Sequence, residues 1–331
     1  MRPFKYTRAK DGAEAVKSAS ANSKAKFLAG GTNLIDLMKE DVERPDELID
    51  ITRLAFAQIK TAGGGAVQIG ALAKNTDTAN HPLIRQNFPL LSQAILAGAS
   101  GQIRNMATNG GNLNQRTRCT YFYDTAMPCN KREPGSGCGA MEGINRMHAV
   151  FGWSDNCVAV HPSDMCVALA ALDAVVKVQD AKGNERSIPF ADYHRLPGTT
   201  PEKDNNLGQG DLVTSIEIPK NNFAGKSYYL KVRDRASYAF ALVSVAAALE
   251  TDGKKIKEAR LAMGGVAHKP WRASAAENFL KGKEATRENF EKAAEAEMKA
   301  AKPLEHNKFK VELGKRAIVR ALTMAMSSGK A

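Results

Sequence analysis

An apolar run that breaks at a pair of glycines constrains the first part of this chain more than any other stretch does. The sequence Lys26-Phe-Leu-Ala-Gly-Gly-Thr-Asn-Leu34 predicts a strand, a glycine turn and the start of a helix, which Thr32 or Asn33 is suited to cap. Two successive residues without a Cβ let the backbone turn tightly and bring its N–H groups close to a ligand. Such a row of N–H groups binds anions, so we interpret the turn as a phosphate-binding loop.

A second glycine pair repeats this arrangement about 80 residues later, in Ala107-Thr-Asn-Gly-Gly-Asn-Leu113. Two such loops can approach one pyrophosphate from two sides, which indicates a dinucleotide ligand. Neither loop has the Gly-x-Gly-x-x-Gly spacing of the Rossmann fingerprint, so that fold is disfavoured.

The periodicity of apolar residues predicts alternating strands and helices along most of the chain. Strands are expected near 4–6, 26–29, 47–51, 67–72, 174–179, 212–218, 228–233 and 260–263, and helices near 11–20, 33–40, 75–80, 89–97, 163–171, 239–249, 287–302 and 311–326. We expect three units, at residues 1–60, 61–222 and 223–331, the last a small α+β domain. Residues 114–157 form an irregular insertion in the second unit, dense in Gly, Pro, Arg and Cys.

Composition narrows the classes of protein to which the chain can belong. Of the 331 residues, 43% are hydrophobic and 25% are charged, which is typical of a globular protein. The net charge of +12 is spread along the chain without a basic arm or a nucleic-acid-reading motif, so we expect no nucleic-acid partner. No window is apolar enough for a membrane span or a signal peptide, so we expect cytoplasmic synthesis and export only together with a partner.

The five cysteines fall into two groups. Cys166 lies in the apolar run Met165-Cys-Val-Ala-Leu-Ala170 and is expected to be a small core residue. The other four, Cys119, Cys129, Cys138 and Cys157, lie within or at the edge of the irregular insertion. Four thiols in a segment with no other means of ordering itself predict a metal site, whose binding free energy orders the segment.

The spacing of these four cysteines does not identify the metal. The gaps of nine, eight and eighteen residues match neither a Cys-x-x-Cys zinc pattern nor a ferredoxin run, and zinc and an iron-sulfur cluster each accept four thiolates. Nearby cations, at Arg116, Arg118, Lys131, Arg132 and Arg146, can offset the charge of thiolate ligands. Two disulfides or four inert thiols are the alternatives. The six histidines are scattered and show no ligand spacing.

Five motifs, in this order along the chain, resemble a known family. They are the two glycine loops, His161-Pro-Ser-Asp-Met165, Ser215-Ile-Glu-Ile-Pro219 and Gly264-Gly-Val-Ala-His-Lys-Pro-Trp-Arg272. Together they resemble the FAD-binding medium subunit of the xanthine dehydrogenase and aldehyde oxidoreductase family of molybdenum hydroxylases. The resemblance implies an α+β fold, with a two-part FAD-binding region of the vanillyl-alcohol-oxidase type and a small C-terminal domain like that of the CO dehydrogenase flavoprotein.

The resemblance also implies the residues that bind FAD. Both glycine loops hold the pyrophosphate, Ser163 and Asp164 lie by the adenosine or ribityl part, and Lys231 lies near the flavin ring. The complete implied set is Lys26, Phe27, Leu28, Ala29, Gly30, Gly31, Thr32, Asn33, Leu34, Thr108, Gly110, Gly111, Asn112, Ser163, Asp164, Val213 and Lys231. No catalytic residue is expected, because substrate oxidation belongs to a partner chain.

Most members of this family lack the cysteine insertion. The insertion here is similar to that of the FAD subunit of bacterial periplasmic aldehyde oxidoreductase, which implies a 4Fe-4S cluster on Cys119, Cys129, Cys138 and Cys157. The implied function is an electron-transfer subunit of a heterotrimer. Its partners are a large molybdenum-cofactor subunit, a small 2Fe-2S subunit and an external electron acceptor, and the complex is periplasmic if it is co-exported.

Three other functions remain as alternatives. The chain could be the beta subunit of an enzyme like 4-hydroxybenzoyl-CoA reductase, in which the cysteine spacing differs. It could be an autonomous flavin oxidase, which would turn over without partners. The non-enzyme alternative is a basic binding module held together by zinc.

Overall fold

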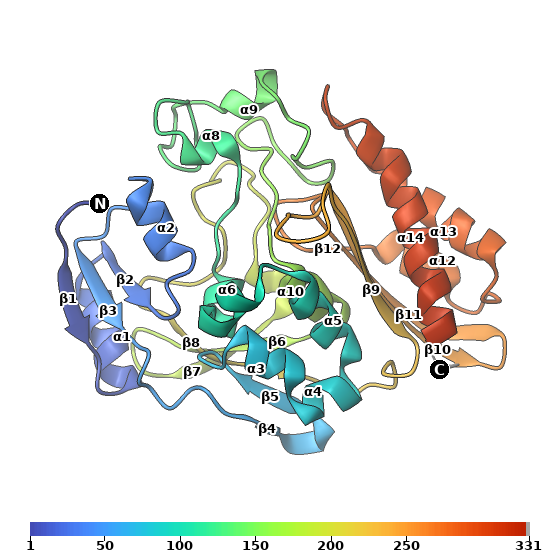
Figure 1. Ribbon diagram of the computed structural model, residues 1–331, viewed down its shortest axis with the longest axis horizontal. Helices are drawn as coiled ribbons and strands as arrows, with labels where there is room; N and C mark the ends of the chain where they lie inside the picture. Colours follow the sequence, from blue (N-terminus) through green and yellow to red (C-terminus); the bar gives the residue numbers. More distant parts are fainter. Residues whose placement is uncertain (329–331) are drawn as a thin grey trace.

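Three β-sheets are arranged along the chain in the computed structural model, which describes residues 1–328 (Figure 1). Helices and strands are both abundant, so the predicted α+β class is confirmed. Among the described residues, no helix combines the length and the apolar character needed to cross a bilayer.

The first sheet has three parallel strands in the order β1-β3-β2. These are β1 (Lys5–Arg8), β2 (Ala25–Leu28) and β3 (Glu47–Asp50), with α1 (Gly12–Ala21) and α2 (Leu34–Lys39) in the connections. Parallel neighbours need crossover connections, and the helices provide them. The first glycine loop leaves the sheet at the end of β2, as its sequence predicts.

The second sheet has five antiparallel strands in the order β4-β5-β8-β6-β7. They are β4 (Ile59–Thr61), β5 (Val67–Gly70), β6 (Val175–Gln179), β7 (Glu185–Pro189) and β8 (Leu212–Ile218). A short 3-10 turn, Gly63–Gly65, joins β4 to β5. The helices of this unit are α3 (Asn75–Asn80), α4 (Pro82–Asn87), α5 (Pro89–Ala97), α6 (Gly101–Met106), α7 (Asn109–Leu113), α10 (Asp164–Ala171) and α11 (Phe190–Tyr193).

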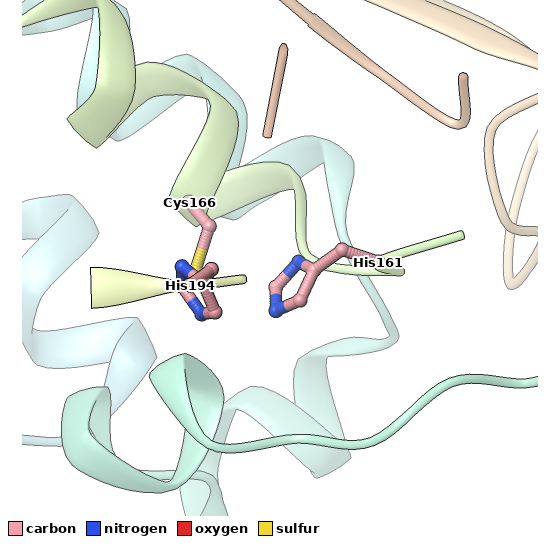
Figure 2. A group of neighbouring side chains, drawn as sticks. All are labelled: His161, Cys166 and His194. Atoms are coloured by element: carbon pink, nitrogen blue, oxygen red, sulfur yellow. The ribbon is translucent and has the colours of Figure 1, made fainter. Parts of the chain in front are cut away.

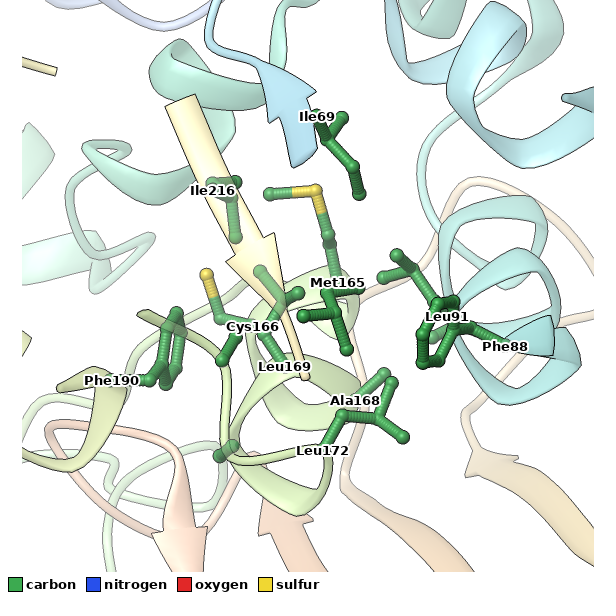
Figure 3. Close-up of a cluster of buried hydrophobic side chains, with 14 of the residues drawn as sticks. Ile69, Phe88, Leu91, Met165, Cys166, Ala168, Leu169, Leu172, Phe190 and Ile216 are labelled. Atoms are coloured by element: carbon green, nitrogen blue, oxygen red, sulfur yellow. The ribbon is translucent and has the colours of Figure 1, made fainter. Parts of the chain in front are cut away.

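Helix α10 lies at the centre of the molecule, and all eight of its residues are buried. A helix that is apolar on every side has to be covered on every side, and α5, β10 and β11 pack against this one. Figure 3 shows Met165 and Cys166 of α10 close to Ile216 of β8 and Leu91 of α5. Cys166 is therefore a core residue, as the sequence predicts. Ser163 caps the helix by accepting a hydrogen bond from the Cys166 N–H at 3.1 Å.

The third sheet has four antiparallel strands in the order β12-β11-β10-β9. Its strands are β9 (Ser227–Val232), β10 (Val243–Asp252), β11 (Lys255–Gly264) and β12 (Trp271–Arg272), and its helices are α12 (Ser274–Leu280), α13 (Arg287–Met298) and α14 (Phe309–Ser328). The three helices cover one face of the sheet (Figure 1). Helices α10 and α5 pack against the other face.

One predicted element is wrong. We expected residues 239–249 to be helical, but residues 243–252 form strand β10. The strand is central in its sheet, with α14 on one side and α10 on the other, so its first seven residues are all buried. A strand buried on both faces loses the alternation of apolar and polar residues that identifies a strand, and its apolar run then looks like that of a buried helix.

The cysteine segment crosses the molecule between the first and third sheets and contains two single-turn helices, α8 (Thr120–Tyr123) and α9 (Gly139–Glu142) (Figure 1). Arg132 orders it by donating from Nη1 to the carbonyls of Phe122 at 2.8 Å and Tyr121 at 3.0 Å. The Arg116 guanidinium lies over the Phe122 ring, 4.8 Å from its centroid.

Candidate functional site

The first glycine loop packs directly against the segment that leads into the second. A Cβ added at Gly30 would lie 2.2 Å from the Met106 carbonyl oxygen, so only glycine permits this approach. Gly31 has φ +72°, in the left-handed region that glycine adopts without strain. The tertiary structure thus brings the two glycine loops, far apart in sequence, to one place.

The backbone of the first loop presents unpaired donors. Within residues 1–328, none of the N–H groups of residues 30–34 has a hydrogen-bond partner. Asn33 occupies the N-cap position of α2 but makes no capping bond, because its Oδ1 accepts from the Arg116 N–H at 2.9 Å. These free N–H groups are the donors that an anionic ligand requires.

The polar groups of the second loop are hydrogen-bonded within the protein, and these bonds fix the shape of the loop. Thr108 Oγ1 accepts from the Gly111 N–H at 3.2 Å, and the Gly110 N–H donates to the Ala71 carbonyl at 2.7 Å. Asn112 donates to Asn75 Oδ1 at 2.8 Å and accepts from Ser163 Oγ at 2.6 Å. The structure therefore gives the two loops different tasks: the first offers donors and the second forms a rigid wall.

Two adjoining cavities open along these loops. The first, which we call the loop cavity, has a volume of about 530 Å³ and lies between the first sheet and the segment 202–213. The second, which we call the inner cavity, has a volume of about 230 Å³ and lies against α5, α10 and the segment 238–240. Thr32, Asn33 and Gly111 line both cavities, so the glycine loops stand where the two meet.

Nearly all the residues predicted to bind FAD line one of these cavities. The loop cavity is lined by Lys26, Phe27, Ala29, Gly30, Gly31, Thr32, Asn33, Leu34, Thr108, Gly110, Gly111 and Val213. The inner cavity adds Asn112, Ser163, Asp164 and Lys231. Leu28 lines neither cavity.

A buried ion pair forms one wall of the inner cavity. Lys231 Nζ lies 2.7 Å from Asp164 Oδ2, and the two side chains are 4% and 8% exposed. The Tyr229 hydroxyl donates to Asp164 Oδ1 at 2.6 Å, and Lys231 also donates to the Ala97 carbonyl at 3.1 Å. Burial, followed by the Asp164 carboxylate, raises the pKa of Tyr229 well above its ordinary value, so the phenol stays neutral and remains a donor.

Sequence reasoning missed other residues of the inner cavity. Asp36, Arg118, Tyr238 and Phe240 line it as well. Arg118 pairs with Asp36 at 2.8 Å and stacks over the Phe240 ring, 5.5 Å from its centroid. The unusual exposure of two aromatic residues in the segment 238–240 is the kind of signal that identifies a ligand site, but it becomes visible only in the fold.

The four cysteines of the insertion converge on one small cavity, the cysteine pocket, between α8 and the segment that ends at Cys157. An antiparallel bridge joins the backbones of Cys129 and Cys138, and Asn130 stabilises this hairpin by accepting from the N–H groups of Gly135 and Gly137. All five cysteines of the chain are free thiols. The alternative of disulfides finds no support in this geometry.

The four sulfur atoms stand further apart than one zinc ion requires. A tetrahedral zinc with Zn–S bonds of about 2.3 Å holds its sulfur ligands about 3.8 Å from one another. Within the described chain, no three of the Sγ atoms of Cys119, Cys129, Cys138 and Cys157 lie within 4.8 Å of one another. Four thiols around one pocket are a donor set that an iron-sulfur cluster accepts, and a cluster several atoms across does not need sulfur atoms as close as those around one zinc ion.

Cys119 and Cys157 are largely buried, and a nearby lysine partly offsets the negative charge that a thiolate would carry at Cys157. Burial raises the pKa of Cys119 to about 12 and that of Cys157 to about 11, so both are thiols until a metal displaces their protons. Lys131 lies near Cys157 and opposes its shift, but Lys131 is itself paired with Asp204. His148 Nε2 lies 3.1 Å from Cys119 Sγ.

A second group of potential ligand residues lies in the core. His161, Cys166 and His194 bring their ligand-type atoms within 4.8 Å of one another (Figure 2). The imidazoles pack edge to face, with centroids 4.4 Å apart, and Tyr193 packs on His194 in the same manner. His194 Nε2 donates to the Leu113 carbonyl at 2.9 Å, and burial lowers its pKa to about 4. We interpret this group as neutral aromatic packing beneath the cap of α10.

Two family models match consecutive parts of the chain. Residues 2–221 match the FAD binding domain in molybdopterin dehydrogenase, and residues 228–325 match the CO dehydrogenase flavoprotein C-terminal domain.

Individual relatives match over nearly the full length. The chain is 50% identical to the aldehyde oxidoreductase FAD-binding subunit PaoB of Escherichia coli, over 98% of this chain and 99% of that one. It is 32% identical to the glyceraldehyde dehydrogenase medium chain of Sulfolobus acidocaldarius, over 85% and 82% of the two chains. Among solved structures, carbon monoxide dehydrogenase from Hydrogenophaga pseudoflava superposes with a TM-score of 0.77 at 26% identity, over 99% of each chain.

Proposed function

The chain belongs to the FAD-binding medium subunits of the molybdenum hydroxylase family, and from this we propose that it holds FAD and a 4Fe-4S cluster as the electron-transfer subunit of an aldehyde oxidoreductase. The observation that carries the proposal is the convergence of two glycine loops on adjoining cavities beside a pocket of four thiols. Its partners are a large molybdenum-cofactor subunit and a small 2Fe-2S subunit, and electrons leave to an external acceptor.

The free N–H groups of residues 30–34 would hold the pyrophosphate of FAD, because they are the unpaired donors at the junction of the two cavities. The larger loop cavity would then take the adenosine, and the inner cavity the flavin end. Lys231 would place a positive charge near the flavin, oriented by Asp164. Bound FAD supplies the electron-carrying chemistry, while the chain fixes its position and its electrostatic surroundings.

Cys119, Cys129, Cys138 and Cys157 would ligate the 4Fe-4S cluster. The separation of their sulfur atoms favours a cluster over a single zinc ion, which also argues against a zinc-stapled binding module. The His148 imidazole next to Cys119 is a group of the kind that tunes a cluster through a hydrogen bond to sulfur.

We also propose the division of the chain into residues 1–60, 61–222 with the insertion 114–157, and 223–331. The three sheets, each with its own helices, support three units. Strand β4 (Ile59–Thr61) pairs within the second sheet, so the first boundary falls just before residue 59. A complex assembled before export would be periplasmic, and we propose this location because the cysteine insertion resembles that of the FAD subunit of bacterial periplasmic aldehyde oxidoreductase.

Cofactor analysis of the purified chain tests the proposal. We expect a yellow-brown protein with FAD and about four irons per chain. The Cys129→Ser variant should lose iron, whereas the matched control Cys166→Ala, whose thiol lies in the core, should retain it. A colourless protein that contains zinc would contradict the proposal.

Two further measurements separate the remaining alternatives. An autonomous oxidase would turn over an aldehyde without partners, and we expect no turnover by the isolated chain. In the assembled complex, the rate of flavin reduction by substrate shows whether the cluster is a relay. If the Cys129→Ser complex keeps the wild-type rate while lacking iron, the cluster is structural.

A further inference from the structure

A buried network of ion pairs joins the cysteine segment, residues 114–157, to the wall of the loop cavity. Asp204 lines this cavity and stands at the centre of the network. Lys131 Nζ donates to Asp204 Oδ1 at 2.5 Å and to the Pro201 carbonyl at 2.7 Å. Arg116 Nε donates to Asp204 Oδ2 at 2.8 Å. The Lys131 side chain is 1% exposed, so these contacts replace its hydration.

Arg116 extends the network to the other side of the loop cavity. Its Nη1 donates to Glu43 Oε1 at 2.6 Å, and its backbone N–H donates to Asn33 Oδ1 at 2.9 Å. Asn33 belongs to the first glycine loop, and Glu43 follows α2. Arg116, Asn33, Glu43 and Asp204 all line the loop cavity. One residue of the cysteine segment therefore contacts both sides of the proposed FAD site.

The charge of Asp204 is balanced by the cysteine segment alone. Within residues 1–328, the only basic group besides Lys131 and Arg116 within 4.0 Å of this carboxylate is His268 Nε2. Burial lowers the pKa of His268 to about 4, so the imidazole is neutral at pH 7. If the two cations were displaced, a bare carboxylate would face the cavity and repel an anionic ligand.

The same cations are tied to the cysteine pocket. Lys131 follows Cys129 by two residues and lines the pocket, and so does Phe122, whose ring lies beneath the Arg116 guanidinium. The segment has only two single-turn helices, and its four thiols are free. In a segment of this kind the free energy of metal binding becomes ordering free energy. Whatever orders the cysteines therefore also places Lys131 and Arg116.

We propose that the cysteine segment couples the two cofactor sites, so that the bound cluster raises the affinity of the chain for FAD, an inference that rests on the proposed function. In the ordered segment, Lys131 and Arg116 neutralise Asp204 and hold the first glycine loop through Asn33. Loss of the cluster releases the segment, and the Asp204 carboxylate then opposes the pyrophosphate. Coupling between two binding sites is reciprocal, so FAD also strengthens retention of the cluster. Lys131, Arg116 and Asp204 act as positioning residues, and none has to carry an electron.

The wild-type chain gives the first test, because no substitution is needed. Iron is removed from the purified full chain with a chelator, and FAD is titrated into flavin-free protein with and without iron while flavin fluorescence is followed. We expect the iron-free chain to bind FAD at least about fivefold more weakly, the lower end of the coupling typical of two linked sites. Rebuilding the cluster with iron and sulfide should restore the affinity. Far-UV circular dichroism shows whether the iron-free chain remains folded.

The Lys131→Met variant tests the route of the coupling. Lys131 lines the cysteine pocket but not the loop cavity, so it does not line the space proposed for FAD. With its cluster present, rebuilt if necessary, this variant should bind FAD at least about fivefold more weakly than the wild type. Removing its iron should then change the affinity by less than about twofold, because the coupling is already broken.

The matched control is Arg146→Leu. Arg146 is a cation of the same segment, but its partner Asp234, at 2.8 Å, does not line the loop cavity. We expect this variant to bind FAD like the wild type and to show the same loss of affinity when iron is removed.

Each failure has its own meaning. Equal FAD affinity of the iron-loaded and iron-free wild-type chains overturns the coupling and leaves the proposed function intact. Undiminished coupling in Lys131→Met overturns the route through Asp204. An iron-free chain that unfolds altogether also overturns the inference, because FAD is then lost with the whole fold. A wild-type chain that holds neither FAD nor iron overturns the proposed function itself.

Discussion

The close approach of Gly30 to the backbone of Met106 gives the sharpest test of the FAD site. In Gly30→Ala the new Cβ would lie 2.2 Å from a carbonyl oxygen, which is 0.8 Å closer than the 3.0 Å below which Cβ contacts essentially never occur. The oxygen belongs to backbone and cannot rotate away, so the first loop has to move. Overpacking of this kind costs about 1 to 3 kcal/mol.

The affected N–H groups are those proposed to bind the pyrophosphate, so the displacement should weaken FAD binding. A cost of about 1 to 3 kcal/mol corresponds to roughly 5- to 140-fold weaker affinity if it falls entirely on the FAD-binding conformation. The dissociation constant can be measured by titrating FAD into flavin-free protein and following flavin fluorescence.

The matched control is Gly101→Ala, at the start of α6, where an added Cβ meets no atom within 4 Å. We expect this variant to bind FAD like the wild type. The reasoning is refuted if Gly30→Ala and Gly101→Ala bind FAD equally tightly and unfold at the same temperature, because the loop would then tolerate a side chain that the geometry excludes.

Three further predictions concern buried titratable groups. Asp204→Asn should lower the free energy of unfolding by about 3 to 5 kcal/mol, measured by urea denaturation, because it leaves the almost fully buried Lys131 ammonium without its carboxylate; an effect below 1 kcal/mol would contradict this pairing. Burial lowers the pKa of His194 to about 4, so between about pH 6.5 and pH 4 the unfolded chain binds a proton that the folded chain does not. The free energy of unfolding should therefore fall as the pH falls through this window, by up to roughly 3 kcal/mol. The His194→Gln variant should show a correspondingly flatter dependence of stability on pH. Lys310→Met should lower the free energy of unfolding by about 1 to 3 kcal/mol, because the buried Lys310 Nζ donates to two backbone carbonyls, at 2.7 and 2.9 Å, that would lose their donor. If Lys310→Arg unfolds at the same temperature as Lys310→Met, packing and not hydrogen bonding is what matters at this position.

The local pattern of the sequence predicted most elements but failed where burial is complete on both faces. The periodicity of residues 89–97 and 311–326 is that of one-sided helices, and both are helical. The run at 239–249 has no polar face, and its neighbours α14 and α10 made it a strand. Propensity alone could not decide this, because alanine and leucine favour helices, whereas the valines and the pairing with β9 and β11 favour a strand.

The inner cavity shows the same limit for function. Sequence motifs pointed to Ser163, Asp164 and Lys231, which the fold brings to one wall. They gave no sign of Tyr238 or Phe240, whose roles depend on which surfaces face each other after the third sheet packs on α10. Residues of this kind carry no local signature.

The amino-acid sequence by itself determined the family, the two glycine loops and the four clustered thiols, because each depends on residue types within a short stretch of chain. Only the tertiary structure decided that Gly30 contacts Met106 and that the N–H groups of the first loop are free while those of the second are hydrogen-bonded. It also decided that the four cysteines line one pocket, where no three of their sulfur atoms lie within 4.8 Å of one another in the described chain. The physical reason is that free donors, cavities and ligand separations are properties of packing between segments distant in sequence, and no local pattern records them.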